Sequence, residues 1–425
     1  MKIEDLHKLF LESKGVSTDT RKIKEGSMFF ALKGENFNAN EFAEQALQKG
    51  AKYAIIDEEK YSRGENFILV KNVLKALQEL ASFHRNYLGI PIIGLTGSNG
   101  KTTTKELINA ALSKKYKTTA TSGNLNNHIG VPLTLLSMNK QTEIGIVEMG
   151  ANHRKEIAFL CQIAQPDYGY ITNFGKAHLE GFGGVEGVIK GKSELYEYLK
   201  ANEKTIFLNL DDPIQKKHLS YQKIYSFGSD EKPDVPVEYL QGGNFAAIRV
   251  AGYEINSKMI GSYNGKNMAA AYTIADYFKV APEEIKKALE NYIPGNNRSQ
   301  VINRENLTII LDAYNANPTS MAAAIENLEA MPQRPKTVIL GDMFEMGESS
   351  KAEHQELAER LQKGSIDSVY IIGKAFYGTS TDSRIKKYRT FEDFTADYSS
   401  GSIDNGVVLI KGSRGMALER ALEFI

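Results

Sequence analysis

The fold is decided by residues 91–103, which read Pro91-Ile92-Ile93-Gly94-Leu95-Thr96-Gly97-Ser98-Asn99-Gly100-Lys101-Thr102-Thr103. The apolar first half predicts a buried strand, and the glycine-containing loop leads into a helix from about Lys101 to Lys115. Glycines allow backbone N–H groups to turn inward around phosphate oxygens, and the following helix presents its positive end to the anion. Lys101 can reach the β- and γ-phosphates, and the Thr102 hydroxyl can bind Mg²⁺. The stretch therefore predicts a nucleotide-binding loop.

The loop departs from the general phosphate-loop pattern G-x-x-x-x-G-K-[ST] at its first glycine. That pattern requires glycine at position 95, where the chain has Leu95, and Gly97 stands three residues before Gly100 instead. The alternative interpretation is a helix N-terminus that happens to read Gly-Lys-Thr. Because the strand, the glycines, the lysine and the hydroxyl fall in register, we favour nucleotide binding.

Strands and helices alternate after this loop. Strand candidates lie at Ile144–Glu148, Tyr168–Asn173 and Thr205–Asn209, separated by helical stretches. Such alternation is typical of a mostly parallel sheet with helices on both faces. Alternating residues over about 236–260 predict a small β-hairpin inserted in this region.

Two further α/β units flank the central one. The first 85 residues predict a small unit with strands at Ser27–Leu32 and Tyr53–Ile56. The last part predicts a helix at Met416–Phe424 and four β-rich runs, namely Thr308–Leu311, Thr337–Leu340, Val369–Ile372 and Val407–Ile410. We therefore predict an α/β protein of three domains, with a central P-loop parallel-sheet ATPase domain and a C-terminal Rossmann-like doubly wound domain. The predicted boundaries are 1–85, 86–298 and 299–425.

The composition excludes several classes of protein. Hydrophobic residues make up 42% of the 425 residues and charged residues 24%, which excludes a collagen-like or wholly disordered chain. Lys+Arg and Asp+Glu are both 52, so a basic nucleic-acid-binding surface over the whole chain is disfavoured. The single cysteine, Cys161, cannot form an intramolecular disulfide. No apolar stretch approaches the ~18 residues of a membrane span, and the first residues do not resemble a signal peptide, so we expect a cytoplasmic location.

Three residues near predicted strand ends are candidates for metal binding. Glu148 ends an apolar strand, where ligands bind in open α/β sheets, and its alternative role is capping or ion pairing. His178 follows the strand ending at Asn173, and by itself is more simply an exposed loop histidine. Lys192 lies in a predicted helix, where a lysine is usually a solvated surface group.

Two polar clusters could offer groups to a ligand. The segment Gly123-Asn124-Leu125-Asn126-Asn127 provides several amides, although an ordinary turn-rich loop would read similarly. The segment Asp312-Ala313-Tyr314-Asn315-Ala316-Asn317-Pro318 follows a strand and precedes a helix. Asn317 can be a helix cap and nothing more, but the cluster is richer than capping requires.

Together these motifs resemble the Mur ligase family of peptidoglycan synthesis, over the whole chain and in the same order. Residues 96–103 match the family's short phosphate loop, which accounts for Leu95. The segments that resemble the branch adding D-alanyl-D-alanine are the two clusters above together with Gly130-Val131-Pro132-Leu133-Thr134, Leu340-Gly341-Asp342-Met343, Glu345-Met346-Gly347 and Lys411-Gly412-Ser413-Arg414-Gly415.

The resemblance implies an ATP-dependent amide ligase that joins D-alanyl-D-alanine to UDP-N-acetylmuramoyl-tripeptide through an acyl phosphate. It implies ATP and two Mg²⁺ as cofactors, a UDP-substrate-binding N-terminal domain and a ligase C-terminal domain. The expected partners are the two substrates, without nucleic acid, and we expect a monomer in the cytoplasm. The alternatives are another Mur-family amino-acid ligase, such as the one adding the third residue or the folate polyglutamate enzyme, and a P-loop nucleotide switch.

The resemblance also implies roles for individual residues. The implied catalytic residues are Lys101, Glu148, His178 and Lys192. The implied metal ligands are Thr102, Glu148, His178 and Lys192, the last as a carbamate formed with CO₂, which turns a cation into an oxygen ligand. The implied nucleotide contacts are Gly97, Ser98, Asn99, Gly100, Lys101, Thr102, Thr103, Asn264, Asn267, Arg298, Asp312 and Tyr314. The implied substrate contacts are Asp19, Thr20, Arg21, Lys33, Gly34, Asn124, Asn126, Asn127, Asn315 and Asn317.

The predicted first domain departs from the family pattern at two places. Members of this branch often carry Asp-Gly-His where the chain reads Phe37-Asn38-Ala39-Asn40, and Thr20 stands where serine is common. The uridine-side contacts are therefore the part of the site that the resemblance defines least.

Overall fold

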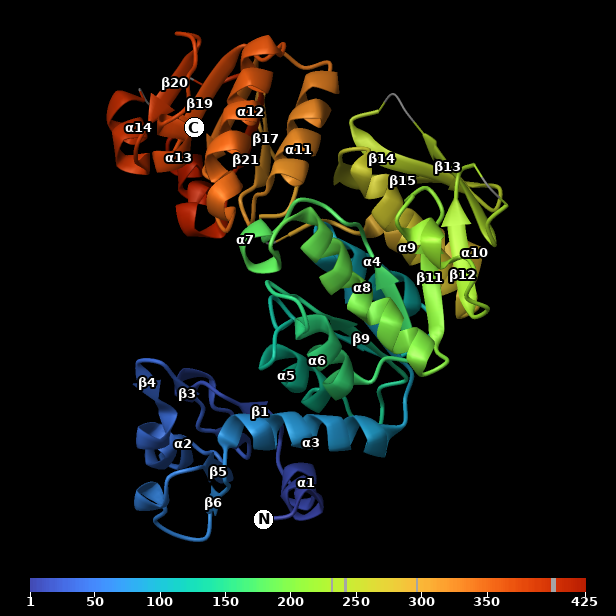
Figure 1. Ribbon diagram of the computed structural model, residues 1–425, viewed down its shortest axis with the longest axis vertical. Helices are drawn as coiled ribbons and strands as arrows, with labels where there is room; N and C mark the ends of the chain where they lie inside the picture. Colours follow the sequence, from blue (N-terminus) through green and yellow to red (C-terminus); the bar gives the residue numbers. More distant parts are fainter. Residues whose placement is uncertain (231, 241–242, 296, 399–402) are drawn as a thin grey trace.

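The computed structural model describes residues 1–230, 232–240, 243–295, 297–398 and 403–425, which form three α/β units in a row (Figure 1). The N-terminal and C-terminal units lie at opposite ends and the central unit lies between them. Within those ranges, none of the helices combines the length and the apolar character needed to cross a membrane. The predicted α/β fold class is confirmed.

The N-terminal unit contains a small sheet with the strand order β1-β2-β5-β6, in which all neighbours are parallel. A separate antiparallel pair, β3 and β4, lies beside it. The helices and strands of this unit are α1 (Ile3–Leu11), β1 (Val16–Ser17), β2 (Met28–Phe30), β3 (Lys33–Gly34), β4 (Phe37–Asn38), α2 (Ala43–Gln48), β5 (Tyr53–Ile56), β6 (Phe67–Leu69) and α3 (Val73–Leu88), with short 3₁₀ turns at Thr20–Lys22, Ala39–Phe42 and Glu59–Tyr61.

The central unit is built on a sheet with the order β15-β14-β13-β12-β11-β10-β7-β9-β8. Its helices are α4 (Lys101–Leu112), α5 (Gly130–Leu136), α6 (Glu156–Ala164), α7 (Leu179–Phe182), α8 (Val185–Ala201), α9 (Tyr263–Tyr277) and α10 (Pro282–Asn291). Its strands are β7 (Ile92–Thr96), β8 (Thr118–Ala120), β9 (Ile144–Glu148), β10 (Tyr168–Ile171), β11 (Thr205–Asn209), β12 (Ile224–Gly228), β13 (Val235–Leu240), β14 (Phe245–Val250) and β15 (Tyr253–Ile260). A 3₁₀ turn lies at Gln215–His218.

Strand β7 lies in the interior of this sheet and places the phosphate loop. All its residues are buried, as expected for a parallel strand covered on both faces. It pairs in parallel with β9 on one side and with β10 on the other. The carboxyl ends of β7, β9 and β10 therefore meet at one edge, where an open α/β sheet binds its ligands. The hairpin predicted over 236–260 is more extensive, because β13, β14 and β15 form an antiparallel meander that continues the sheet through β12.

The C-terminal unit has the sheet order β16-β17-β21-β18-β19-β20, which is parallel apart from β16. The four predicted runs correspond to β17, β18, β19 and β21, whereas the edge strands β16 and β20 were not predicted. The helix predicted at Met416–Phe424 is wrong, since the chain forms two 3₁₀ segments there. The elements are β16 (Gln300–Arg304), β17 (Leu307–Asp312), α11 (Pro318–Ala330), β18 (Lys336–Gly341), α12 (Ser350–Lys363), β19 (Ser368–Ile372), α13 (Lys374–Tyr377), β20 (Ile385–Tyr388), α14 (Phe391–Asp397) and β21 (Gly406–Lys411), with 3₁₀ turns at Gly347–Ser349, Arg414–Met416 and Leu418–Glu423.

Helix α3 joins the N-terminal unit to the central one. It begins where the Asn72 side chain accepts a hydrogen bond from the Lys75 N–H at 2.8 Å and ends at Gly89, whose φ of +62° suits glycine. On one side it packs against α1, and on the other against α5 and α6. Arg85 near its end forms an ion pair with Asp167 at 2.6 Å, just before β10. The helix therefore belongs to the cores of both units.

Two buried histidines extend this junction. His7 Nε2 lies 3.0 Å from His84 Nδ1, and His84 Nε2 lies 3.0 Å from the Met138 carbonyl oxygen. Because a carbonyl only accepts, His84 carries its proton on Nε2 and accepts at Nδ1 from the His7 N–H. The His84 ring is therefore neutral, and the chain of hydrogen bonds runs from α1 through α3 to Met138, just after α5.

We expect this pair to make the stability of the N-terminal junction depend on pH. Burial, followed by the neighbouring His84, lowers the pKa of His7 from 6.5 to about 4. Between pH 6.5 and about pH 4 the His7 side chain binds a proton in the unfolded chain but not in the folded chain. The stability of the folded chain is therefore retained above pH 6.5 and lost as the pH falls towards 4. The expected loss is up to about 3 kcal/mol. Thermal unfolding midpoints measured from about pH 7 to about pH 4.5 test this. Burial also lowers the pKa of His84, so His7→Gln, which keeps an N–H donor without titrating, should reduce the slope of the profile and leave the part due to His84. An unchanged profile would contradict the prediction.

Candidate active site around the phosphate loop

The loop between β7 and α4 is shaped by glycines whose neighbours leave no room for a side chain. Gly97 has φ +144°, and a Cβ there would lie 2.0 Å from Thr172 Oγ1. Gly100 has φ +76° and precedes α4, and a Cβ there would lie 2.8 Å from Asn267 Oδ1. These close approaches seat the loop between the end of β10 and helix α9.

Side chains on the loop fix it to the segment that follows β10. Ser98 Oγ donates to the Gly175 carbonyl at 2.9 Å, and the Asn99 N–H donates to Asn173 Oδ1 at 3.0 Å. Lys101 Nζ folds back and donates to the Gly97 and Ser98 carbonyls at 2.7 and 3.1 Å. Burial lowers the pKa of Lys101, and the nearby Glu148 carboxylate opposes that effect. The loop is thus held in place before any anion binds.

A cavity of about 780 Å³ opens in front of the loop and is shared by the central and C-terminal units. Its lining contains most of the residues predicted for the nucleotide and the peptide substrate. From those predictions it includes Ser98, Asn99, Gly100, Lys101, Thr102, Thr103, Asn124, Asn126, Asn127, Glu148, His178, Asn264, Asn267, Arg298, Asp312, Tyr314, Asn315 and Asn317. Gly97 lies behind the loop against β10, and Lys192 lies deeper in the protein.

Glu148 is the buried acid of the cavity, only 1% exposed at the end of β9. Its Oε1 accepts a hydrogen bond from Asn126 Nδ2 at 2.7 Å, whereas Oε2 has no hydrogen-bond partner among the described residues. A buried carboxylate oxygen without a donor fits a cation, since burial of an unpaired charge is otherwise costly. Asn127 instead holds the turn into α5, accepting from the Gly130 N–H at 2.9 Å.

Lys192 and His178 differ from what their sequence context alone suggested. The interpretation of Lys192 as a solvated surface lysine is wrong, because the residue is fully buried and its Nζ donates to the Ala151 carbonyl at 3.1 Å. Burial lowers the pKa of Lys192 well below its ordinary value, with a further contribution from the charge of Lys101. His178 lines the cavity, and its Nδ1 is hydrogen-bonded to Glu345 of the C-terminal unit. No group of three or more His, Cys, Asp and Glu side chains that could hold a metal occurs among the described residues.

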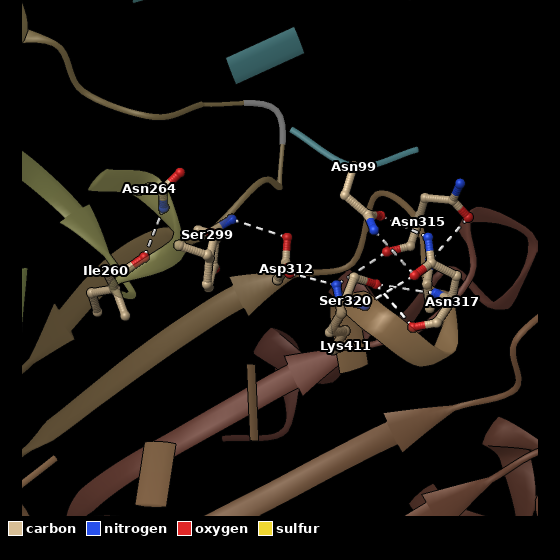
Figure 2. A network of polar contacts seen from close by, with 11 residues as sticks. Asn99, Ile260, Asn264, Ser299, Asp312, Asn315, Asn317, Ser320 and Lys411 are labelled. Carbon is tan, nitrogen blue, oxygen red and sulfur yellow. Dashed lines mark hydrogen bonds and ion pairs between the residues drawn. The ribbon is translucent and has the colours of Figure 1, made fainter. Parts of the chain in front are cut away.

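Asn264 and Asn267, two of the predicted nucleotide contacts, form one connected hydrogen-bond network on α9. Asn267 Nδ2 donates to Asn264 Oδ1 at 2.8 Å. Asn264 Nδ2 donates to the Ile260 carbonyl at 2.8 Å (Figure 2). Thr104 Oγ1, on α4, donates to Asn267 Oδ1 at 3.1 Å. Both asparagines are buried and face the cavity. The network therefore links α9 to the helix that follows the phosphate loop.

Strand β17 carries the C-terminal side of the cavity. Asp312 accepts hydrogen bonds from the Ser299 N–H at 3.1 Å and from Lys411 Nζ, which also donates to the Asn315 carbonyl at 3.2 Å (Figure 2). The Arg298 guanidinium lies over the Tyr314 ring, 3.6 Å from its centre. A stacked cation and aromatic ring offer a flat surface next to an anion-binding loop.

Asn317 contacts the phosphate loop across the two units. Its Nδ2 donates to Asn99 Oδ1 at 2.7 Å, and Asn99 Nδ2 lies 3.4 Å from Asn317 Oδ1 (Figure 2). The same Oδ1 caps α11 by accepting from the Ser320 N–H at 2.9 Å. Asn317 is therefore a helix cap and also the partner of the loop.

The residues predicted for the uridine side lie outside the cavity lining. Asp19 and Arg21 form an ion pair with each other at 2.9 Å, next to Thr20, and Arg21 is exposed. Lys33, beside Gly34, is paired with Asp57 and Glu58 at 2.9 and 2.7 Å. The structure keeps these residues on the N-terminal unit, apart from the phosphate loop.

Several cavity residues were not assigned from the sequence. Asp211 and Asp212 follow β11 and line the cavity, and Lys411 ends β21 with 2% exposure. Each stands directly after or at the end of an apolar run, so the strand-end rule that singled out Glu148 would also have found them. Glu345 carries no such signal, because only the packing of the two units brings it to His178.

The comparisons with known proteins agree with this geometry. Family models match residues 12–85 ("Mur ligase family, catalytic domain"), 95–275 ("Mur ligase middle domain") and 297–414 ("Mur ligase, glutamate ligase domain"). The UDP-N-acetylmuramoyl-tripeptide–D-alanyl-D-alanine ligase of Bacillus subtilis is 36% identical, covering 96% of this chain and 92% of that protein.

Two solved structures are similar over the whole chain. MurF from Acinetobacter baumannii has a TM-score of 0.85 and 30% identity, covering 99% of this chain and 98% of that one. MurF ligase from Thermotoga maritima in complex with ADP has a TM-score of 0.84 and 29% identity, covering 98% and 97%. With the family models spread over all three units and relatives aligned nearly end to end, the chain belongs to the Mur ligase family.

Proposed function

We propose that the chain is an ATP-dependent ligase that joins D-alanyl-D-alanine to UDP-N-acetylmuramoyl-tripeptide in peptidoglycan precursor synthesis. The observation that carries this proposal is the shared cavity, which places a phosphate loop opposite the strand ends of a second α/β unit. The end-to-end similarity to ligases of that name supports the choice of substrates.

The reaction has two steps. The terminal carboxylate of the tripeptide attacks the γ-phosphorus of ATP, which releases ADP and leaves an acyl phosphate. The free amine of D-alanyl-D-alanine then attacks the acyl carbon, and the tetrahedral intermediate expels phosphate as the amine loses its proton. Water must be kept from the acyl phosphate, and we propose that the three domains close around ATP and both substrates for that purpose.

The chain's own residues bind and orient the nucleotide. Backbone N–H groups of residues 97–102 surround the phosphates, and Lys101 turns from the loop carbonyls to the transferring phosphoryl group. On the nucleoside side we place Asn264, Asn267, Arg298, Asp312 and Tyr314. We place the peptide substrates against Asn124, Asn126, Asn127, Asn315 and Asn317, and the uridine diphosphate against Asp19, Thr20, Arg21, Lys33 and Gly34.

Two Mg²⁺ ions are part of the proposal. The orphaned Glu148 Oε2 and the buried Thr102 hydroxyl would hold one ion, and His178 with Lys192 the other. Bound there, the ions would neutralise charge on the phosphoryl oxygens.

We propose further that Lys192 is carbamylated. A buried lysine whose pKa is lowered keeps a neutral, nucleophilic amine, and CO₂ adds to that form. A ¹³C resonance of a carbamate that appears with labelled bicarbonate and is missing in Lys192→Met tests this. Wild-type protein without such a resonance would rule the carbamate out.

The proposal also includes the domain boundaries, the oligomeric state and the cellular location of the protein. We propose domains at 1–85, 86–298 and 299–425. The first boundary lies between the matched family models 12–85 and 95–275, and the second lies two residues inside the model that begins at residue 297. We also propose that the protein acts as a monomer in the cytoplasm, where nucleotide-linked precursors and ATP are available.

The deciding experiment measures phosphate release and product mass with the UDP-muramoyl tripeptide. We expect a product heavier by one D-alanyl-D-alanine, formed only when ATP, magnesium and the dipeptide are all present. Addition of a single amino acid to a shorter precursor would instead indicate another Mur-family ligase. ATP turnover that is indifferent to the dipeptide would favour a P-loop nucleotide switch.

A further inference from the structure

The segment between β10 and α7 lies between the phosphate loop and the C-terminal unit. On one side the Gly175 carbonyl accepts from Ser98 of the phosphate loop. On the other side the Lys176 N–H donates to Thr319 Oγ1 at 3.0 Å, and Lys176 Nζ pairs with Glu353 at 2.7 Å. His178, at the end of this segment, contacts Glu345. Two separate side-chain contacts thus join the segment to the C-terminal unit. Lys176 pairs with Glu353 of α12, and His178 contacts Glu345 in the loop after β18.

Both partners of the second contact have unusual backbone conformations. His178 has φ +52° and Glu345 has φ +60°, in the left-handed region that side chains seldom adopt. Such conformations are strained for residues other than glycine and persist where the surrounding structure imposes them. The loop after β18 and the loop after β10 therefore hold these two side chains against each other at an energetic cost.

The contact determines which imidazole nitrogen is available to a ligand. A carboxylate can only accept, so the neutral form of His178 that pairs with Glu345 carries its proton on Nδ1 and its lone pair on Nε2. His178 lines the cavity. A histidine that binds a metal through one nitrogen usually donates the other N–H to a carboxylate or carbonyl, which fixes its tautomer and ring orientation.

We propose that Glu345 is the positioning residue for the metal site: its carboxylate fixes His178 in the tautomer whose Nε2 binds the cation. The inference rests on the proposed function, in which His178 is a metal ligand. Since Glu345 comes from the C-terminal unit and His178 from the central unit, the ligand is correctly oriented only when the two units are docked. The second metal site is therefore completed by the approach of the C-terminal unit.

The test measures metal binding without turnover. The wild-type chain and its variants are titrated with Mn²⁺ in the presence of a non-hydrolysable ATP analogue, and free Mn²⁺ is followed by electron paramagnetic resonance. We expect Glu345→Ala to weaken Mn²⁺ binding by about 10–100-fold. Glu345→Gln retains an oxygen that can accept from Nδ1 and should recover part of the affinity. In parallel, ¹⁵N chemical shifts of the His178 ring should show loss of the single Nδ1–H tautomer in Glu345→Ala.

Two controls separate positioning from docking. Glu348→Gln changes an exposed carboxylate three residues along the same loop and should leave Mn²⁺ binding unchanged. Glu353→Gln weakens a different contact between the same two units, the Lys176–Glu353 pair, and should also leave Mn²⁺ binding unchanged, because His178 keeps its partner. If Glu353→Gln weakens Mn²⁺ binding as much as Glu345→Ala, Glu345 acts only through docking and the inference is overturned.

The remaining outcomes distinguish this inference from the proposed function. If the wild-type chain binds Mn²⁺ and Glu345→Ala binds it equally well, the positioning role fails while the ligase assignment stands. If His178→Ala also keeps full affinity, the histidine is not a ligand and the inference is again overturned. If the wild-type chain with the ATP analogue binds no Mn²⁺ at all, the metal-dependent reaction fails together with the inference.

Discussion

Lys101→Met is expected to lower kcat by about 10²–10³-fold while the protein remains folded. The ammonium of Lys101 hydrogen-bonds to carbonyls of the phosphate loop and can turn to the transferring phosphoryl group without moving the backbone. Methionine fills a similar volume but cannot neutralise charge that develops on the phosphoryl oxygens. Phosphate release with saturating tripeptide and dipeptide measures the loss, and circular dichroism confirms that the fold is kept.

Lys105 provides the matched control on the same helix. It is also a buried lysine, 3% exposed, but its Nζ donates to the Thr121 carbonyl at 2.6 Å and it is absent from the cavity lining. Lys105→Met should therefore lower the thermal midpoint and leave kcat within a few-fold of wild type. Equal losses of kcat in both variants would mean that Lys101 supports activity by stabilising the fold, and not by neutralising charge on the phosphoryl group.

Gly97→Ala is expected to reduce ATP affinity by on the order of 100-fold, because the loop must move away from its partner strand. A Cβ at this position would lie 2.0 Å from Thr172 Oγ1 and 2.9 Å from the Thr172 nitrogen, so backbone as well as side chain would have to shift. The backbone N–H groups of the loop would then no longer converge on the phosphates. Calorimetric titration with a non-hydrolysable ATP analogue measures the effect.

Gly64→Ala separates the clash from the backbone strain. Gly64 has φ +147°, close to the +144° of Gly97, but a Cβ there meets nothing within 4 Å. Alanine at either position therefore costs a similar backbone strain of about 1–3 kcal/mol, but only alanine at position 97 also meets the clash. Nucleotide affinity in Gly64→Ala should match wild type. A comparable loss of nucleotide affinity in both variants would show that backbone strain, transmitted through the fold, weakens binding. The clash would then not be the cause.

The part of the fold around the phosphate loop could be predicted because its signals are local. The apolar run Ile92–Thr96 is buried on both faces, and glycine, lysine and hydroxyl follow at fixed spacing. The strands β9 and β11 were predicted with their observed bounds for the same reason. The edge strands β16 and β20 were missed because their residues are partly exposed and lack an apolar run.

The site was harder to predict where tertiary packing decides the chemistry. Lys192 looks like a surface lysine in its own helix, and only the packing of α8 against α7 and the β9 loop buries it. Asn317 has a cap signature that hides its second bond to Asn99, 218 residues away. His178 and Glu345 are 167 positions apart, and the sequence around them likewise carries no local sign of the contact. The resemblance to the ligase family implies roles for Lys192, Asn317 and His178, but it does not indicate which partners hold them.

The Asn99–Asn317 pair has a mechanical consequence for the joint between the central and C-terminal units. Both side chains are neutral amides, so their attraction is insensitive to ionic strength, whereas the neighbouring Lys176–Glu353 pair is partly exposed and weakens as salt screens it. Rising salt would therefore weaken the Lys176–Glu353 pair and leave the amide pair and the neutral bond from the Lys176 N–H to Thr319 in place. We therefore expect the C-terminal unit to keep its contact with the tip of the phosphate loop at ionic strengths that screen the charged contacts.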